Sequence, residues 1–240
     1  MISSSSQIEV SLCCYDLKPS QESQRVTKTV SGNQEPVSHR NSRENLERLL
    51  DEIIEQPERL DEITRSMDEM FGQEKAVMIL DMSGFSQTTQ RFGITSFLLM
   101  IHEMQRIAEP CVVAHNGLVL KTEADNLFCL FDNVADAVRS SQEITRHLAA
   151  ANQILPQSRR LYVSIGIGYG MILNIADEDL YGNEVNLASK LGEDIGGMGE
   201  ILLTSAAHAQ LQESDIQCKT ESISISISGL ELTYFTVQNA

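Results

Sequence analysis

Basic side chains are scarce in this 240-residue chain, in which 18 Lys and Arg residues stand against 34 Asp and Glu residues. The formal net charge of −16 repels a phosphate backbone and argues against nucleic-acid binding. Long hydrophobic runs are also missing: the most apolar segment, residues 94–101, is much shorter than the roughly 18 residues that cross a bilayer. The sequence therefore predicts no nucleic-acid partner and no transmembrane segment.

Cysteine is infrequent and shows no disulfide framework. The five cysteines are odd in number, and Cys111 and Cys129 lie in apolar runs where a buried thiol is expected. Adjacent Cys13 and Cys14 suit neither a disulfide nor, without further ligands, a zinc site. Residues 1–6 lack the basic and apolar regions of a secretory signal. These features predict a cytoplasmic protein with free thiols.

The N-terminal third differs in composition from the rest of the chain. Residues 1–42 hold ten serines with little periodicity, and we expect them to be mainly disordered. Residues 43–72 are expected to form a helical linker or stalk, capped by Asn41 or Ser42, with Pro57 either kinking it or starting a second helix. The linker could pack against the following domain or act as a dimerising stalk that transmits a signal. Residues 1–72 are thus the candidate region for a regulatory partner.

Residues 73–240 are expected to form a single domain. Apolar patterns predict strands near 76–80, 118–121, 127–131 and 161–167, with helices from 94 to before Pro110 and from 134 to 154. The order strand, helix, strand, strand, helix, strand is the ferredoxin-like split βαβ (βαββαβ) arrangement, with helices on one sheet face. A short helix at 182–191 and strands near 201–203, 223–227 and 232–237 predict an additional C-terminal extension. The fold class is therefore α+β.

Two acidic residues occupy positions suited to metal binding. Asp81 follows the first predicted strand at a glycine-containing turn, and Asp125 lies in the turn between the next two strands. In a split βαβ sheet these turns can lie side by side, and two converging carboxylates repel unless a cation lies between them. Taken alone, Asp81 could simply cap the following helix.

Three motifs resemble, in order and spacing, those of the class III adenylyl/guanylyl cyclase catalytic domain. They are residues 81–86 (DMSGFS), 121–125 (KTEAD) and 179–191 (DLYGNEVNLASKL), and the likeness extends from about residue 75 to 235. The resemblance implies a homodimer with the active site formed between two chains. It further implies a metal site made by Asp81, Asp125 and the Met82 carbonyl, which holds two Mg²⁺ or Mn²⁺ ions. The backbone of Gly84, Phe85 and Ser86 would bind the triphosphate.

The resemblance also assigns substrate and catalytic roles. Lys121 and Asp179 match the positions that select the base, and this pair is similar to the adenine-selecting one. Adenine offers an acceptor at N1 for a lysine and a donor at its exocyclic amine for an aspartate. Asn186 matches the ribose-orienting asparagine. These matches imply ATP as substrate and cyclic AMP and pyrophosphate as products.

The chain departs from the family pattern at several positions. Lys190 replaces an arginine that contacts the transition state, and a lysine cannot make the same bidentate contact. A phosphate-binding lysine expected before Gly229 is absent, Ala124 replaces a glycine, and Gly168 replaces a common histidine. Loss of one preorganised polar contact typically slows catalysis on the order of 10²-fold. A slow adenylate cyclase is expected, with a nucleotide-binding or regulatory module without turnover as the alternative.

Simpler interpretations exist for some of these residues. Lys121 could form only an ion pair with Glu123, and Asp179 could belong to a solvated acidic loop. His115 and His147 show no spacing typical of metal ligands, and a core or surface role is expected for both.

Overall fold

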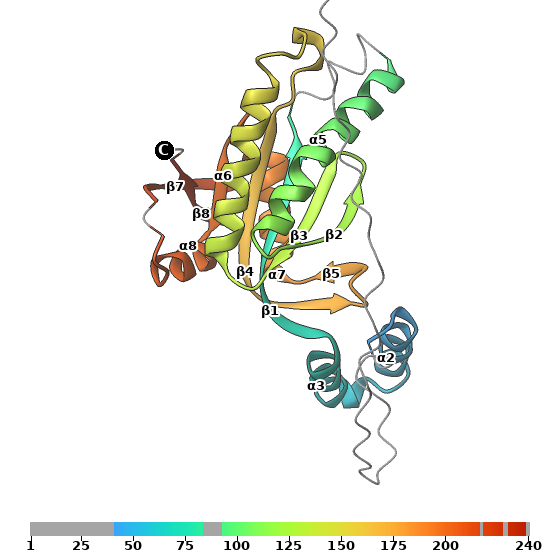
Figure 1. Cartoon of the computed structure of the whole chain (residues 1–240). Coiled ribbons are helices and arrows are strands. Elements are labelled where there is room, and N and C mark those ends of the chain that lie inside the picture. The colour runs from blue at the N-terminus through green and yellow to red at the C-terminus, as the bar shows by residue number, and fades with distance from the viewer. Residues whose placement is uncertain (1–40, 84–92, 217, 228–229, 239–240) are drawn as a thin grey trace, which may run out of the picture. The chain divides into compact units, whose positions relative to one another are not determined.

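An eight-stranded sheet forms the centre of the protein (Figure 1). The structure, a computed structural model, describes residues 41–83, 93–216, 218–227 and 230–238. The strand order is β2-β3-β1-β4-β6-β8-β7, and β5 pairs with β4. The strands are β1 (Gly72–Met82), β2 (Leu118–Glu123), β3 (Asn126–Phe131), β4 (Val163–Ile175), β5 (Asp179–Tyr181), β6 (Ile201–Thr204), β7 (Thr220–Ile227) and β8 (Leu230–Val237).

The helices comprise two N-terminal ones, two long ones in the core and shorter ones in the C-terminal part. They are α2 (Arg43–Glu55), η1 (Pro57–Arg59), α3 (Leu60–Phe71), α5 (Ile94–Ala114), α6 (Val134–Ala151), η2 (Gln157–Arg159), α7 (Asn183–Ser189), the π-helical η3 (Lys190–Ile195) and α8 (Ser205–Gln212). None of the helices in the described part of the chain has the length and hydrophobicity needed to cross a bilayer.

The sequence β1-α5-β2-β3-α6-β4 forms the predicted βαββαβ core. β1 lies between β3 and β4 and runs antiparallel to both, and β2 pairs with the outer edge of β3. β6 adds to the other side of β4 in parallel, followed by the antiparallel strands β8 and β7. The predicted α+β fold with a C-terminal extension is therefore confirmed. Neither β5 nor α8 is predicted by the sequence patterns.

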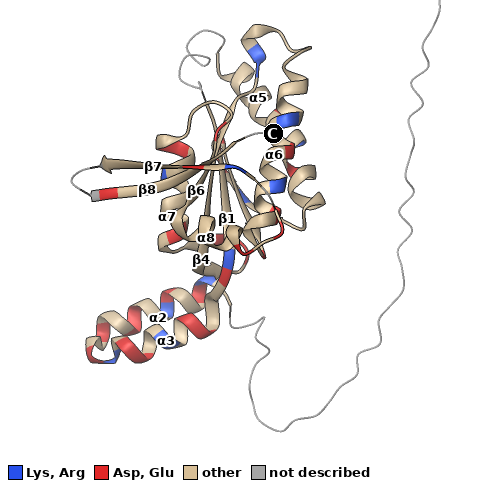
Figure 2. Cartoon of the chain, turned by 90° about the vertical axis from the view of Figure 1, so that its left-hand side faces the viewer, with Lys and Arg blue, Asp and Glu red and all other residues tan. Residues whose placement is uncertain are grey.

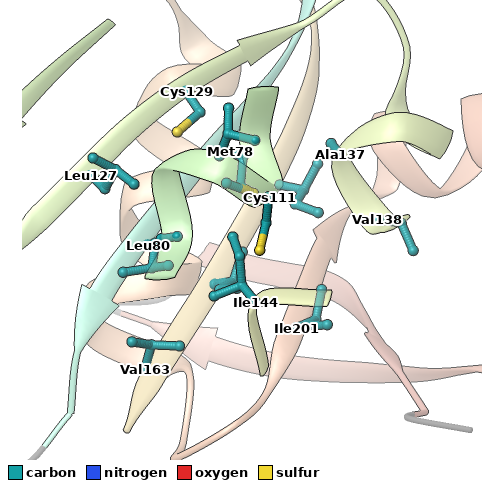
Figure 3. Packing of buried hydrophobic residues seen from close by; sticks show 14 of the residues in the cluster. Met78, Leu80, Cys111, Leu127, Cys129, Ala137, Val138, Ile144, Val163 and Ile201 are labelled. Atoms are coloured by element: carbon teal, nitrogen blue, oxygen red, sulfur yellow. The ribbon is translucent and has the colours of Figure 1, made fainter. Parts of the chain in front are cut away.

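The apolar run in β1 is continuous because both faces of this strand are buried. Met78 and Leu80 face the cluster formed with α5 and α6, and Figure 3 shows them packed beside Cys111 and other residues of that cluster. Val77 and Ile79 face the opposite cluster, to which α7 contributes. The helices of the core thus cover one face of the sheet, while α7 of the extension covers part of the other.

The prediction that the first long helix ends before Pro110 is wrong. α5 continues through Pro110 to Ala114. A proline inside a helix removes one backbone hydrogen bond and crowds the preceding turn. Here the apolar periodicity continues beyond the proline, with Cys111 and Val112 both buried in the core. Burial of that last turn offsets the cost of the interrupted hydrogen bond.

The N-terminal helices pack against the end of β4. The Ser42 hydroxyl caps α2 by accepting from the Asn45 backbone N–H at 3.2 Å. Pro57 is the first residue of η1, so it starts a new helical segment. Apolar residues of α2 and α3, including fully buried Ile63, form a cluster with Ile175 of β4. Charged residues of both signs cover the outer surfaces of α2 and α3 (Figure 2).

Candidate active site

Two carboxylates lie close enough to repel each other where β1 ends. Asp81 is next to the last residue of β1, and Asp125 lies in the two-residue turn between β2 and β3. Leu80 of β1 pairs with Leu127 of β3, so the register places Asp81 beside this turn. Burial and repulsion from Asp125 raise the pKa of the Asp81 carboxyl to about 7, although a hydrogen bond from the Met82 backbone N–H opposes the shift.

Glu193 is a third carboxylate of this cluster, and the sequence analysis did not identify it. Its charge contributes to the raised pKa of Asp81, and burial and the neighbouring acids raise the pKa of Glu193 as well. Glu193 lies in η3, which crosses close above β1 at Gly192. A Cβ on Gly192 would lie 2.9 Å from the Ile79 carbonyl oxygen, so this approach needs a glycine.

The donor set of this cluster fits a hard divalent cation. Carboxylate oxygens are the ligands that Mg²⁺ and Mn²⁺ prefer. A cation between Asp81 and Asp125 would relieve the repulsion that raises the pKa of Asp81. Met82, whose carbonyl is the predicted additional ligand, is the final residue of β1. Gly84, Phe85 and Ser86, the predicted triphosphate-binding segment, lie outside the described residues.

Lys121 of β2 and Asp179 of β5 form a second polar group. Lys121 lies on β2 and its Nζ contacts Asp179 Oδ1 at 2.8 Å and Glu123 Oε1 at 2.7 Å. The same ammonium lies 4.8 Å from the centre of the Phe128 ring. The pair with Glu123 expected from the simpler interpretation is thus present together with the pair to Asp179. Burial disfavours the charge of Lys121, but the two carboxylates outweigh it and raise the pKa of Lys121.

Asp179 belongs to a strand and not to a solvated loop. It begins β5, and its side chain is only 18% exposed. Oδ1 accepts hydrogen bonds from Lys121 and from the Leu180 backbone N–H at 2.9 Å. Oδ2 accepts from the Tyr181 hydroxyl at 2.8 Å and from the Arg43 guanidinium at 3.3 Å. Burial opposes ionisation, yet the hydrogen bonds from Lys121, Tyr181 and the Leu180 backbone N–H lower the pKa of Asp179 to about 2.

Asn186 and Lys190 lie four residues apart on the helix formed by α7 and η3. Asn186 is exposed on α7, and Lys190 follows the last residue of this helix. The spacing places both side chains on the same helix face. Lys190 Nζ contacts Asp194 Oδ2 at 2.9 Å. Lys190, which occupies the position of the family arginine, therefore already forms an ion pair with a residue of its own helix.

Two departures from the family pattern have clear structural consequences. Ala124 has φ of 52°, in the left-handed region where a glycine is unstrained. At Gly168, an added Cβ would lie 2.5 Å from the Glu184 carbonyl oxygen. Because α7 lies this close to β4, a histidine at Gly168 would collide with the helix backbone. Gly168 thus allows α7 to pack closely on the sheet.

The chain belongs to the adenylate and guanylate cyclase catalytic domain family. The family model matches residues 54–239, which include both polar groups described above and begin inside α2. The predicted family is therefore confirmed. The boundary predicted between a linker at 43–72 and a catalytic domain at 73–240 remains a prediction.

The curated relatives are longer proteins. The chain is similar to "Putative adenylate cyclase 3" of Rhizobium meliloti (strain 1021), with 28% identity over 133 residues, which are 55% of this chain and 22% of that protein. It is also similar to "Serine/threonine-protein kinase pkn2" of Myxococcus xanthus, with 25% identity over 136 residues, which are 57% of this chain and 16% of that protein. The chain thus spans less than a quarter of the length of either relative.

Solved cyclase structures share the fold. An adenylate/guanylate cyclase/hydrolase from Silicibacter pomeroyi superposes with a TM-score of 0.59 and 22% identity, covering 69% of this chain and 96% of that one. A bacterial light-regulated adenylyl cyclase has a TM-score of 0.60 and 20% identity, covering 70% and 92%. The guanylyl cyclase Cya2 has a TM-score of 0.58 and 19% identity, covering 69% and 92%. Both adenylyl and guanylyl cyclase structures are therefore similar in fold to this chain.

Proposed function

We propose that this chain is an adenylate cyclase that converts ATP to cyclic AMP and pyrophosphate at a site shared by two copies of the chain. The observation that carries the proposal is the direct contact of Lys121 with Asp179, in a chain whose Asp81 and Asp125 carboxylates also converge. The reaction joins the ribose 3′-oxygen to the α-phosphorus, releases pyrophosphate and frees the 3′-hydroxyl proton.

Asp81, Asp125 and the Met82 carbonyl would hold the metal ions. Two Mg²⁺ or Mn²⁺ ions, when bound there, would activate the 3′-hydroxyl and neutralise the leaving pyrophosphate. The nearby carboxylate of Glu193 raises the negative potential at Asp81 and so favours a divalent cation. In the proposal, Asn186 orients the ribose and Lys190 neutralises charge on the phosphates after leaving Asp194.

Lys121 and Asp179 support adenine as the base. The Lys121 ammonium can donate to N1 of adenine, and the Asp179 carboxylate can accept from the exocyclic amine. Guanine in the same orientation would present its carbonyl O6 to the carboxylate and an N1–H to the ammonium. Both contacts would then be unfavourable, and buried polar groups left without partners strongly reduce binding.

The site shared by two copies is proposed from the resemblance to the cyclase family, whose active site forms between two chains. Asp81 pairs with Ser164 near the beginning of β4, whereas Asp179 pairs with Ile175 at its end. Lys121, the other base-binding residue, pairs with Phe128, which pairs with Ile79, so its backbone lies at the level of a residue only two positions before Asp81. Two copies arranged head to tail could place the carboxylates of one beside the base-binding pair of the other.

The direct test is to incubate the purified chain with ATP and Mn²⁺ and to measure cyclic AMP. Product is expected from the wild type and from Asp215→Asn, which removes an exposed carboxylate in the segment after α8. Asp81→Asn and Asp125→Asn should each remove it. Replacing ATP with GTP tests base choice, since the proposal expects little cyclic GMP. Wild-type turnover no greater than that of Asp81→Asn would contradict the proposal.

Two inactive copies should complement each other if the site is shared. Asp81→Asn removes a metal ligand, and Lys121→Ala removes a base contact. In a head-to-tail dimer, a mixture of these variants forms some heterodimers with one intact site. Activity in the mixture that neither variant shows alone is expected. No recovery in a mixture shown to exchange subunits would argue against the shared site.

A regulatory module without turnover is the second candidate, because Lys190 is paired with Asp194. Its signature is ATP binding by calorimetry without product. For the enzyme, Lys190→Arg should raise kcat about tenfold or more with little change in KM, because a guanidinium can contact a phosphoryl group through two hydrogen bonds. The matched variant Lys219→Arg changes an exposed lysine and should leave kcat unaltered.

A further inference from the structure

Four metal-ligating side chains meet between α5 and α6, within the same helix pair that covers the core face of the sheet. α5 contributes Cys111, His115 is the C-cap residue directly after α5, and α6 contributes Glu143 and His147. In each pair the two residues are four positions apart, so they point from the same helix face toward the other helix. The expectation of an ordinary core or surface role for His147 missed this arrangement, because it concerns the packing of two helices.

The ligand atoms of this cluster lie near the spacing of ligands around one small ion. Cys111 Sγ lies 3.4 Å from His147 Nδ1, and the other ring nitrogen, Nε2, lies 3.8 Å from Glu143 Oε1. Only one of these two nitrogens can bind a given ion. Ligand atoms of these three residues all lie within 4.8 Å of one another. In tetrahedral zinc sites, bonds of about 2.0 to 2.3 Å place ligand atoms about 3.3 to 3.8 Å apart. The cluster therefore needs only small side-chain movements to surround an ion.

We propose that Cys111, Glu143 and His147 form a binding site for a zinc-like transition-metal ion that links α5 to α6. The set of one sulfur, one imidazole nitrogen and one carboxylate oxygen is typical of Zn²⁺ and unlike the carboxylate cluster at Asp81. His115 is a positioning residue, because its Nε2 lies 2.6 Å from Glu143 Oε2 and can hold the carboxylate toward the ion.

Burial and access are compatible with this assignment. Cys111 is buried, and the side chains of Glu143 and His147 are 28% and 53% exposed. The ion can therefore enter from the solvent side while the sulfur closes the inner side. In the metal-free chain the Cys111 thiol donates to the Ile107 carbonyl oxygen at 3.2 Å. Metal binding replaces this bond with a metal–thiolate bond and releases the thiol proton to solvent.

Cobalt absorption can test the site independently of cyclase activity. In every protein compared, Cys13 and Cys14 are changed to serine, since they lie outside the described residues and could supply other thiolates. Addition of Co²⁺ to the reduced chain should produce a thiolate-to-metal charge-transfer band, which Zn²⁺ should abolish by displacement. Mg²⁺ should leave it unchanged. A band of the same strength in Cys111→Ser, or no band in the unaltered site, would overturn the proposal.

Matched variants separate metal binding from folding. Cys218→Ser removes a half-buried thiol elsewhere and should retain the band. His147→Gln changes a half-exposed side chain and should weaken Zn²⁺ binding about 100-fold, and His115→Gln should weaken it about 10- to 100-fold. Circular dichroism establishes that each variant is folded. Equal Zn²⁺ affinity in folded His147→Gln and wild type would also refute the site.

Discussion

Replacing Asp81 with asparagine is expected to stabilise the metal-free chain. The Asp81 carboxyl has a pKa of about 7 in the folded protein, against 3.8 for an unperturbed aspartate. The folded state therefore holds this proton more tightly than the unfolded state does. The resulting loss of stability begins as pH rises above about 4 and is complete above about pH 7. Asparagine removes the charge and with it this loss.

The magnitude follows from the difference of about 3 pKa units, which corresponds to about 4 kcal/mol. Asp81 is partly exposed, and solvent screening lowers the expected gain to about 2 kcal/mol. Urea unfolding with a chelator at about pH 8 should show this gain for Asp81→Asn, and the gain should nearly vanish at about pH 4. Asp215→Asn, at an exposed loop position, should behave like the wild type.

Metal ions should make the wild type at least as stable as Asp81→Asn at about pH 8. Added Mn²⁺ should raise the midpoint of the wild type at about pH 8, because an ion that binds only the folded state stabilises it by mass action. The midpoint of Asp81→Asn should respond much less. If Asp81→Asn is no more stable than the wild type at about pH 8 without metal, the inferred electrostatic strain at this cluster is refuted.

Three further substitutions test backbone and charge effects. Ala124→Gly should raise the free energy of unfolding in urea by about 1 kcal/mol, because it relieves a left-handed alanine; an unchanged or lower value would contradict this reason. Gly166→Ala should lower the midpoint of thermal unfolding by many degrees, because the added Cβ would lie 2.0 Å from a backbone carbonyl oxygen of α7. Gly197 is exposed, so Gly197→Ala should change the midpoint little. Asp179→Asn should cost about 1 kcal/mol in urea at about pH 7 and only a small part of that at about pH 2. The stabilisation by the Asp179 carboxylate is complete above the unfolded pKa and is lost as pH falls through the folded value of about 2. An equal cost at both pH values would refute the electrostatic origin.

Local patterns were sufficient to predict the core of the fold. The apolar run of β1, the hairpin around Asp125 and the order of elements define the βαββαβ arrangement. The predicted end of the helix before Pro110 is wrong, because proline's local cost to a helix is offset by the burial of Cys111 and Val112. That burial depends on tertiary packing and cannot be seen in the local sequence. β5 has three residues, too few for periodicity to distinguish a strand from a loop.

Some residues of the candidate sites can be predicted from sequence, and others depend on tertiary packing. Asp81 and Asp125 could be paired from sequence because both lie at the ends of strands that are neighbours in this topology. Glu193 could not, since its position depends on the π-helical path of η3 over β1. The pairs Cys111/His115 and Glu143/His147 each have helical spacing, but only the packing of α5 on α6 brings the two pairs together.

The hydrogen bonds of Asp179 have a thermodynamic consequence. A carboxylate offers about four acceptor positions, and here Lys121, the Leu180 N–H, Tyr181 and Arg43 use them all. If Asp179 reads adenine as proposed, one donor must withdraw, and Arg43 has the longest bond. Arg43 is the first residue of α2. Nucleotide occupancy and the position of this helix are then reciprocally linked, so a protein that draws α2 away would increase ATP affinity by the same factor by which ATP favours that protein.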